Sequence, residues 1–139
     1  MKKTLRISFD LINLWDRDEF RLFIGLIQKN LDHRFIFDLF MISELEDPFT
    51  SAYFLKIQDQ LGLKDERVFQ AVSLTDKIDI LDDNGIDIHF DGFENKIEQI
   101  EEDIINITPI LVTQKRNRDG KMKYIEEFEE ELNRIENES

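Results

Sequence analysis

Three polar side chains stand at the ends of apolar segments, where ligand sites of open parallel sheets are found. Asp10 ends the segment LRISFD, Ser43 ends HRFIFDLFMIS, and Asp91 follows IDIHF. In such sheets, ligands bind beyond the carboxyl ends of the central strands. An acid at such a place either caps the next helix or binds a ligand, and capping is the commoner role. Together with Lys77, which opens a short predicted helix, these residues form a candidate site.

The elements that must position this site alternate along the chain. Strands are predicted in the first half of 5–14 and at 33–43, 67–72, 86–90 and 109–113. Helices are predicted from the spacing of apolar residues at 20–31, 49–61, 74–81 and 94–104. Because parallel strands need crossover connections, this alternation predicts an α/β fold. We expect a single three-layer domain with a five-stranded parallel sheet over residues 1–114.

Residues 115–139 differ in character from the rest of the chain. They begin with the basic stretch KRNRDGKMK and continue as an acidic segment in which Ile125, Phe128, Leu132 and Ile135 are three or four positions apart. This spacing predicts an amphipathic C-terminal helix. It covers fewer than two heptads, so packing on the domain is favoured, with a dimer contact as the alternative.

The acidic composition limits the classes of partner. The chain has 31 acidic and 18 basic residues and a net charge of -13, which argues against general binding of nucleic acids or anionic membranes. The absence of Cys excludes disulfides and thiolate chemistry. No apolar run approaches the roughly 20 residues that span a bilayer, and no signal-like segment opens the sequence. We therefore expect a cytoplasmic protein.

The charge itself has three possible origins: a solvating surface, a mimic of nucleic-acid charge, or carboxylates around a metal ion. Residues 115–139 contain six basic and eight acidic side chains, so most of the negative charge, -11, belongs to residues 1–114. Most of these acids fall on helix faces and caps. A solvating surface therefore explains more of the charge than the candidate site does.

The segments SFDLIN, FMIS, LTDKIDIL and IDIHFDG, in this order and spacing, resemble the haloacid dehalogenase-like (HAD) superfamily. The resemblance covers roughly residues 5–113, and it implies a Rossmann-type fold without a cap domain. It further implies that Asp10 is a nucleophile toward phosphoryl groups and that Lys77 neutralises charge between nucleophile and phosphate. Ser43 would bind a phosphate oxygen, with Thr50 or Ser51 as alternatives. Asp10 and Asp91 would hold Mg²⁺.

Two departures from the family pattern affect the expected activity. Phosphatases of the family read Asp-x-Asp-Gly-Thr in the first motif, whereas this chain has Ile12 in place of the second acid and lacks the glycine that follows it. The fourth motif often has two adjacent acids, whereas Gly92 follows Asp91 here. Proton transfer contributes about 10² to 10⁴ in rate, so the loss of its agent predicts a degenerate phosphatase site.

Three functions follow as hypotheses. The first is a HAD-like protein that binds a phosphorylated small molecule or a protein partner, with little or no phosphatase activity. The second is an active Mg²⁺-dependent phosphohydrolase of the nucleotidase type, in which Asp16, Asp18 or water supplies the proton. The third is an acidic interaction protein that mimics the charge of a nucleic acid, and it depends on the net charge alone.

A second registration of the first motif uses Asp16 and Asp18 instead of Asp10. It would stretch the first strand to about twelve residues, against a usual five or six. We therefore prefer Asp10 and predict that Asp16 and Asp18 cap the following helix. Asp47 is predicted as the cap of the next helix, with Pro48 at its first position. His89 is interpreted as a satisfied partner inside a strand rather than a ligand.

Overall fold

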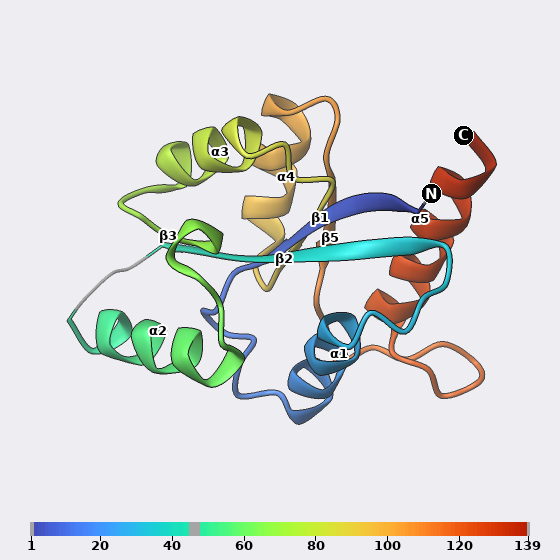
Figure 1. The fold of residues 1–139 in the computed structure, drawn as a ribbon, viewed down its shortest axis with the longest axis horizontal. Helices are drawn as coiled ribbons and strands as arrows, with labels where there is room; N and C mark the ends of the chain where they lie inside the picture. Colours follow the sequence, from blue (N-terminus) through green and yellow to red (C-terminus); the bar gives the residue numbers. More distant parts are fainter. Residues whose placement is uncertain (1, 45–47, 139) are drawn as a thin grey trace.

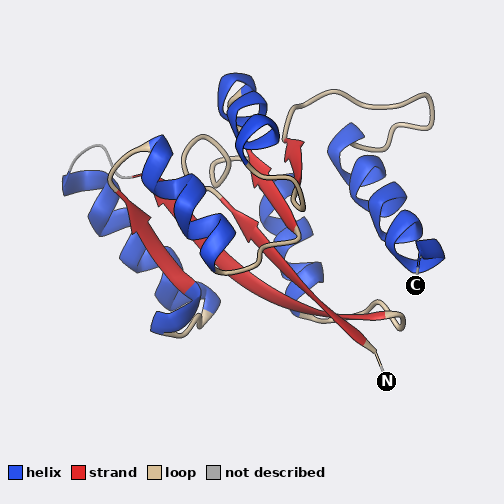
Figure 2. Ribbon diagram, turned by 90° about the horizontal axis from the view of Figure 1, so that it is seen from above, coloured by secondary structure: helices blue, strands red, loops and turns tan. Residues whose placement is uncertain are grey.

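Five parallel strands form one sheet in a computed structural model that describes residues 2–44 and 48–138, except the side chains of residues 48–50. The strands are β1 (Lys3–Phe9), β2 (Phe35–Glu44), β3 (Val68–Ala71), β4 (Ile88–Asp91) and β5 (Thr108–Leu111). Their order in the sheet is β3-β2-β1-β4-β5, and every neighbouring pair is parallel. Figure 2 shows the strand arrows pointing in a common direction. The predicted fold class is confirmed.

Helices cover both faces of the sheet. They are α1 (Asp18–Gln28), α2 (Pro48–Leu61), α3 (Leu74–Asp83), α4 (Glu94–Asp103) and α5 (Lys123–Glu138), with a short 3-10 helix, η1 (Asp65–Arg67), before β3. Helices α1 and α2 lie on one side, and α3 and α4 lie on the other (Figure 1). The result is a three-layer arrangement. None of the helices in the described ranges has the length and apolar character needed to cross a membrane.

Alternation along the strands divides the core into two apolar clusters. Leu5, Ile7 and Phe9 of β1 belong to the larger cluster, which also contains the inner residues of α1 and α2. Phe40 and Ile42 of β2 belong to the smaller cluster beneath α3 and α4. Successive strand residues point to opposite faces, so Ser8 and Asp10 fall on the α3 and α4 side. The polar residues of the candidate site are therefore carried by that face of the sheet.

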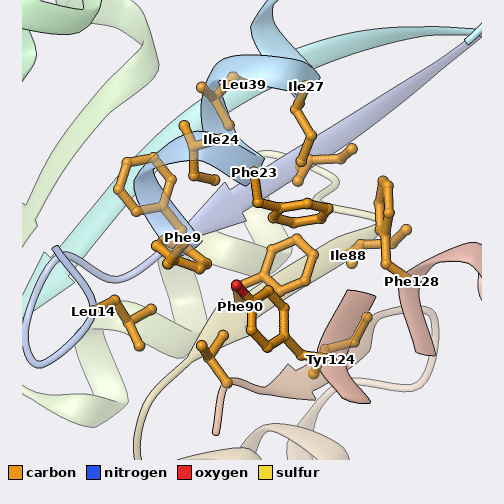
Figure 3. Packing of buried hydrophobic residues seen from close by; sticks show 14 of the residues in the cluster. Phe9, Leu14, Phe23, Ile24, Ile27, Leu39, Ile88, Phe90, Tyr124 and Phe128 are labelled. Carbon is orange, nitrogen blue, oxygen red and sulfur yellow. The ribbon is translucent and has the colours of Figure 1, made fainter. Parts of the chain in front are cut away.

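Helix α5 packs on the same face as α1. The ring of Phe128 lies 5.3 Å from that of Phe23 in α1 and 5.6 Å from that of Phe90 in β4, measured between centroids. The ring of Tyr124 lies 5.6 Å from that of Phe23. Figure 3 shows these four aromatic side chains turned toward one another. The apolar stripe of α5 is thus buried against the domain through contacts between aromatic rings.

The helix caps differ in part from those predicted by the sequence. The N-cap residue of α1 is Arg17, whose side chain makes no capping hydrogen bond. Asp18 is the first helical residue, and its carboxylate pairs with Arg21. The predicted capping roles of Asp16 and Asp18 are therefore wrong, although an acid in the first turn still favours the helix dipole. Asp47 lies outside the described residues.

Candidate functional site

The strand order places the ends of β1 and β4 at the point where the chain changes direction across the sheet. From β1 the chain runs outward through β2 to β3, and it then returns to the other side of β1 to form β4 and β5. Asp10 directly follows β1, and Asp91 is the last residue of β4. The backbone N–H of Asp10 donates to the carbonyl of Phe90 at 3.0 Å. The two acids therefore lie side by side at the switch point, where open α/β sheets bind ligands.

Lys77 joins these two acids. Its Nζ lies 2.8 Å from Oδ2 of Asp10 and 2.5 Å from Oδ2 of Asp91, and all three side chains are fully buried. Lys77 reaches them from the inner face of α3, which it shares with Ile78 and Leu81. The structure thus brings together three residues that are far apart in the sequence.

Ser43 fixes the loop that follows β1. Its Oγ accepts a hydrogen bond from the backbone N–H of Leu11 at 2.7 Å, and its side chain is fully buried. The N–H of Ile12 donates to Oδ1 of Asp10 at 2.9 Å. A hydroxyl has one hydrogen to donate besides its acceptor sites, so Ser43 can still donate to a ligand oxygen. Of the alternatives, Ser51 lies half-buried in α2, and the side chain of Thr50 lies outside the described residues.

The loop after β1 bears on two differences from the HAD pattern, the missing glycine of the first motif and Gly92 of the fourth. Asn13 has a φ of 69°, so it makes the left-handed turn for which the family pattern has glycine. A Cβ atom at Gly92 would lie 3.0 Å from Cδ2 of Leu14 and 3.4 Å from Cβ of Asn13. A side chain at position 92 would therefore require the loop that carries the first motif to give way by a few tenths of an ångström.

Asp16 and Asp18 lie outside the cluster that Lys77 forms with Asp10 and Asp91. Asp16 is exposed, and the side chain of Asp18 is 81% exposed and paired with Arg21. Strand β1 ends at Phe9, so the longer strand required by the second registration does not form. Both acids face solvent, whereas the carboxylate of Asp10 is fully buried.

Two charged residues of the cluster were missed by the sequence analysis. Oε1 of Glu44, the last residue of β2, lies 3.2 Å from Nζ of Lys77 and 3.2 Å from Nζ of Lys96 in α4. The side chains of Glu44 and Lys96 are 13% and 12% exposed. The signal available for Glu44 was its position beside Ser43 at the end of a predicted strand. Lys96 gave none, because a lysine in the first turns of a polar helix is ordinarily solvated.

His89 supports Asp91 from within the sheet. Its Nε2 lies 3.2 Å from Oδ2 of Asp91, and its Nδ1 lies 2.6 Å from Oγ of Ser8. Burial lowers the pKa of His89, although the hydrogen bond to Asp91 opposes this effect, so the ring is neutral at pH 7. Because a carboxylate only accepts, Nε2 carries the hydrogen, and the hydroxyl of Ser8 donates to Nδ1. His89 is thus a satisfied residue of the sheet that also fixes Asp91.

The charges of the cluster stabilise one another. Burial opposes the charge on Lys77, but the carboxylates of Asp10 and Asp91 outweigh it and raise the pKa of Lys77. Burial likewise opposes the charge on Asp91, but His89 and Lys77 outweigh it and lower the pKa of Asp91. With Glu44 and Lys96 included, the cluster contains three carboxylates and two ammonium groups, a formal charge of about -1 at neutral pH.

The donor atoms at the strand ends suit a hard cation. Asp10 and Asp91 offer carboxylate oxygens, which Mg²⁺ prefers, and Mg²⁺ is commonly held by one or two carboxylates together with water and substrate phosphates. Each of their four oxygens already accepts a hydrogen bond from the protein. No group of three or more acidic, His or Cys residues in the described part of the chain is arranged to hold a metal ion. Asp10 and Asp91 are therefore the two residues that would hold Mg²⁺, and they do not form a closed cage around it.

Comparisons with known proteins neither support nor oppose a family assignment. No model of a known protein family matches the sequence. A search of curated proteins likewise finds no significant match.

Proposed function

We propose that this chain is a HAD-like domain that binds a phosphorylated ligand and has little or no phosphatase activity. The observation that carries the proposal is the ammonium group of Lys77, which lies between the carboxylates of Asp10 and Asp91 at the switch point of the sheet. A buried lysine at this place supplies a fixed positive charge for a phosphoryl group. The two carboxylates suit a divalent cation beside it.

Four residues have separate roles in the proposed binding: Lys77, Ser43, Asp10 and Asp91. Lys77 has three N–H donors, of which two are directed at Asp10 and Asp91, so one remains for a ligand oxygen. The hydroxyl hydrogen of Ser43 is a second donor. Asp10 and Asp91 would hold Mg²⁺, which when bound offsets the negative charge of the phosphoryl group. Since the cluster alone is formally negative, we expect phosphate binding to depend on that cation.

The same geometry supports the loss of hydrolysis. Ile12 contacts Asp10 through its backbone N–H, and its hydrocarbon side chain neither donates nor accepts a proton. Asp16 and Asp18 are exposed and do not replace the missing acid. Without a group that protonates the leaving oxygen and activates water, the expected loss in rate is about 10² to 10⁴.

The binding part of the proposal is tested by calorimetric titration of the protein with inorganic phosphate, with and without Mg²⁺. We expect the wild type to bind phosphate only when Mg²⁺ is present. In Asp10→Asn and Asp91→Asn, phosphate binding should no longer depend on Mg²⁺. Asp18→Asn is the matched control, because it removes an exposed acid of the competing registration. It should behave as the wild type. Absence of phosphate binding under all conditions would refute a phosphate-binding function.

The catalytic part is tested with a panel of phosphomonoesters and nucleoside monophosphates in Mg²⁺. We expect no turnover above the uncatalysed rate. Turnover that is abolished by Asp10→Asn but retained in Asp18→Asn would instead establish an active phosphohydrolase. Turnover abolished by Asp18→Asn alone would establish the second registration of the motif.

A further inference from the structure

We propose that Glu44 occupies the position of a ligand oxygen between Lys77 and Lys96, and that the phosphoryl group displaces it on binding. Lys96 then becomes a second cation in contact with the ligand. The inference rests on the proposed function and deepens it, because it identifies an internal competitor for the ligand and a residue that selects for phosphoryl groups. Neither residue belongs to the motifs that suggested the site.

One carboxylate oxygen of Glu44 is shared between the ammonium groups of two lysines. Its Oε1 lies 3.2 Å from the ammonium nitrogen of Lys77 and 3.2 Å from that of Lys96. This oxygen is buried, yet it accepts no hydrogen bond of acceptable geometry from any described residue. This oxygen is therefore held by charge without a directional bond, and a better-aligned oxygen would bind the same lysines more strongly.

The two lysines reach this oxygen from different helices. Lys77 comes from α3 and Lys96 from α4, both on the side of the sheet that carries Asp10 and Asp91. The ammonium group of Lys96 also lies 4.6 Å from the centre of the Phe93 ring, which helps to orient it. Because both nitrogens contact one oxygen, they are close enough to contact two oxygens of a single phosphoryl group.

Charge balance favours displacement over simultaneous binding. With Glu44 in place, three carboxylates face two ammonium groups, and an incoming phosphate would meet a formally negative cluster. With Glu44 turned away, Asp10 and Asp91 are balanced by Lys77 and Lys96. Glu44 is the last residue of β2, and its side chain is 13% exposed, whereas Asp10 and Asp91 are fully buried. It is therefore the acid of the cluster that is best placed to leave.

The test measures the affinity for inorganic phosphate at saturating Mg²⁺ by calorimetry. Because the neutral side chain no longer competes for the lysines, Glu44→Gln should bind phosphate at least about tenfold more tightly than the wild type. Glu44→Ala should bind more tightly as well, which keeps the test open if one variant folds poorly. Lys96→Met should bind at least about tenfold more weakly. Glu98→Gln removes the same charge at an exposed position of α4, so it is the control and should match the wild type.

The outcomes separate this inference from the proposed function. If the wild type binds phosphate and neither Glu44 variant binds more tightly, the displacement is refuted and the phosphate site stands. Weaker binding by both Glu44 variants would show that Glu44 helps to hold the ligand or its cation, which also overturns the inference. Unchanged affinity in Lys96→Met would remove Lys96 from the site. If the wild type and all variants fail to bind phosphate, the proposed function fails and takes the inference with it.

Discussion

The ammonium nitrogen of Lys77 lies 2.5 Å from Oδ2 of Asp91, and both side chains are fully buried. Oδ2 of Asp10 lies 2.8 Å from the same nitrogen. A buried charge is costly unless it is paired, so each member of this triad depends on the others. The candidate functional site is for this reason also part of the buried core.

The first prediction concerns stability after loss of the central cation. Lys77→Met leaves two buried carboxylates without a counter-charge, and we expect a loss of about 3 to 5 kcal/mol in the free energy of unfolding. Denaturation in urea, followed by circular dichroism, measures this loss. The double variant Lys77→Met with Asp91→Asn removes one of the two unpaired buried charges, so it should recover part of the lost free energy of unfolding.

The matched control for this prediction is Lys121→Met. Lys121 pairs with Glu129, but the two side chains are 42% and 51% exposed, so water screens the pair. We expect a loss below about 1 kcal/mol. If Lys77→Met costs no more than the control, the triad is solvated and the burial argument is wrong.

The second prediction concerns the pH dependence of stability through His89. The pKa of His89 is lowered from 6.5 in the folded protein by burial, against the influence of Asp91, while Lys77 adds to the lowering and Asp10 opposes it. As the pH falls below 6.5, the unfolded chain therefore takes up this proton before the folded protein does. Stability is lost over that window, with a slope of at most about 1.4 kcal/mol per pH unit from this group.

His89→Asn should abolish this component of the slope below pH 6.5, whatever it costs in absolute stability. Urea denaturation at closely spaced pH values measures the slope. His33→Asn, which replaces an exposed histidine, is the control for the substitution itself. An equal slope in the wild type and in His89→Asn would contradict the assignment.

The sequence was sufficient to predict the strands and the residues at their ends. The segment IDIHF alternates apolar and polar residues and is bounded by Asn84-Gly85 and Gly92, so both the strand and the position of Asp91 follow from local signals. Asp10, Ser43 and Asp91 could be grouped because parallel strands bring their carboxyl ends to one edge. Local patterns and one rule of topology were therefore enough for this part.

The remaining contacts depend on how the helices dock, which no local pattern contains. The contact of Glu44 with Lys96 requires the docking of α4 beside the end of β2, across 52 positions of the chain. The steric role of Gly92 depends on the path of the loop at Leu14. These two contacts are tertiary properties. The predicted caps at Asp16 and Asp18 failed for a local reason, because α1 begins at Asp18 with Arg17 as its N-cap, so neither acid occupies the capping position.

The third prediction restores the missing acid. Ile12→Asp places a carboxyl group two positions after Asp10, where phosphatases of the proposed superfamily have their general acid/base. If this side chain is what the site lacks, hydrolysis of p-nitrophenyl phosphate in Mg²⁺ should rise by at least about 10² over the wild type. A steady-state assay measures the gain.

The control for this gain is the double variant Asp10→Asn with Ile12→Asp. It retains the new acid but removes the proposed nucleophile, so its activity should return to the level of the wild type. Activity that persists in the double variant would come from another site or from a contaminant. Absence of any gain in folded Ile12→Asp would show that more than one feature of the site has been lost.

The fourth prediction concerns the close packing of Gly92 against the loop at Leu14. Gly92→Ala introduces a Cβ atom 3.0 Å from Cδ2 of Leu14, a fully buried side chain with little room to move. We expect a loss of about 1 to 3 kcal/mol in the free energy of unfolding from this overpacking. Gly25→Ala is the matched control, because its Cβ meets nothing within 4 Å. In the interior of α1 it should stabilise the protein by about 0.5 to 1 kcal/mol.

The two glycine variants therefore differ in the sign of their effect. Thermal unfolding of both under one set of conditions measures the difference. Equal effects would show that the loop at Leu14 can shift at no cost. Such a shift would also make room for the second acid of the family pattern, so Gly92→Asp would then be tolerated as well.

The fifth prediction concerns the hydroxyl group of Tyr124. The side chain is 1% exposed, and among the described residues its hydroxyl oxygen has no hydrogen-bond partner. A buried polar group without a partner costs about 1 to 3 kcal/mol, so Tyr124→Phe should increase the free energy of unfolding by about 1 kcal/mol or more. The ring contacts with Phe23 and Phe90 are kept in this variant. Tyr53→Phe, at a side chain that is 37% exposed, should have little effect.

The pH dependence provides a second readout for the same group. Burial raises the pKa of Tyr124 from 10.0 to about 12, so above pH 10 the unfolded chain releases this proton while the folded protein retains it. Stability is then lost as the pH rises through this window, and Tyr124→Phe does not suffer the loss. The advantage of the Phe variant should therefore grow between pH 10 and 11 in urea denaturation. A variant that is less stable than the wild type at pH 7, with no such growth, would show that the hydroxyl has a partner and is not buried at a cost.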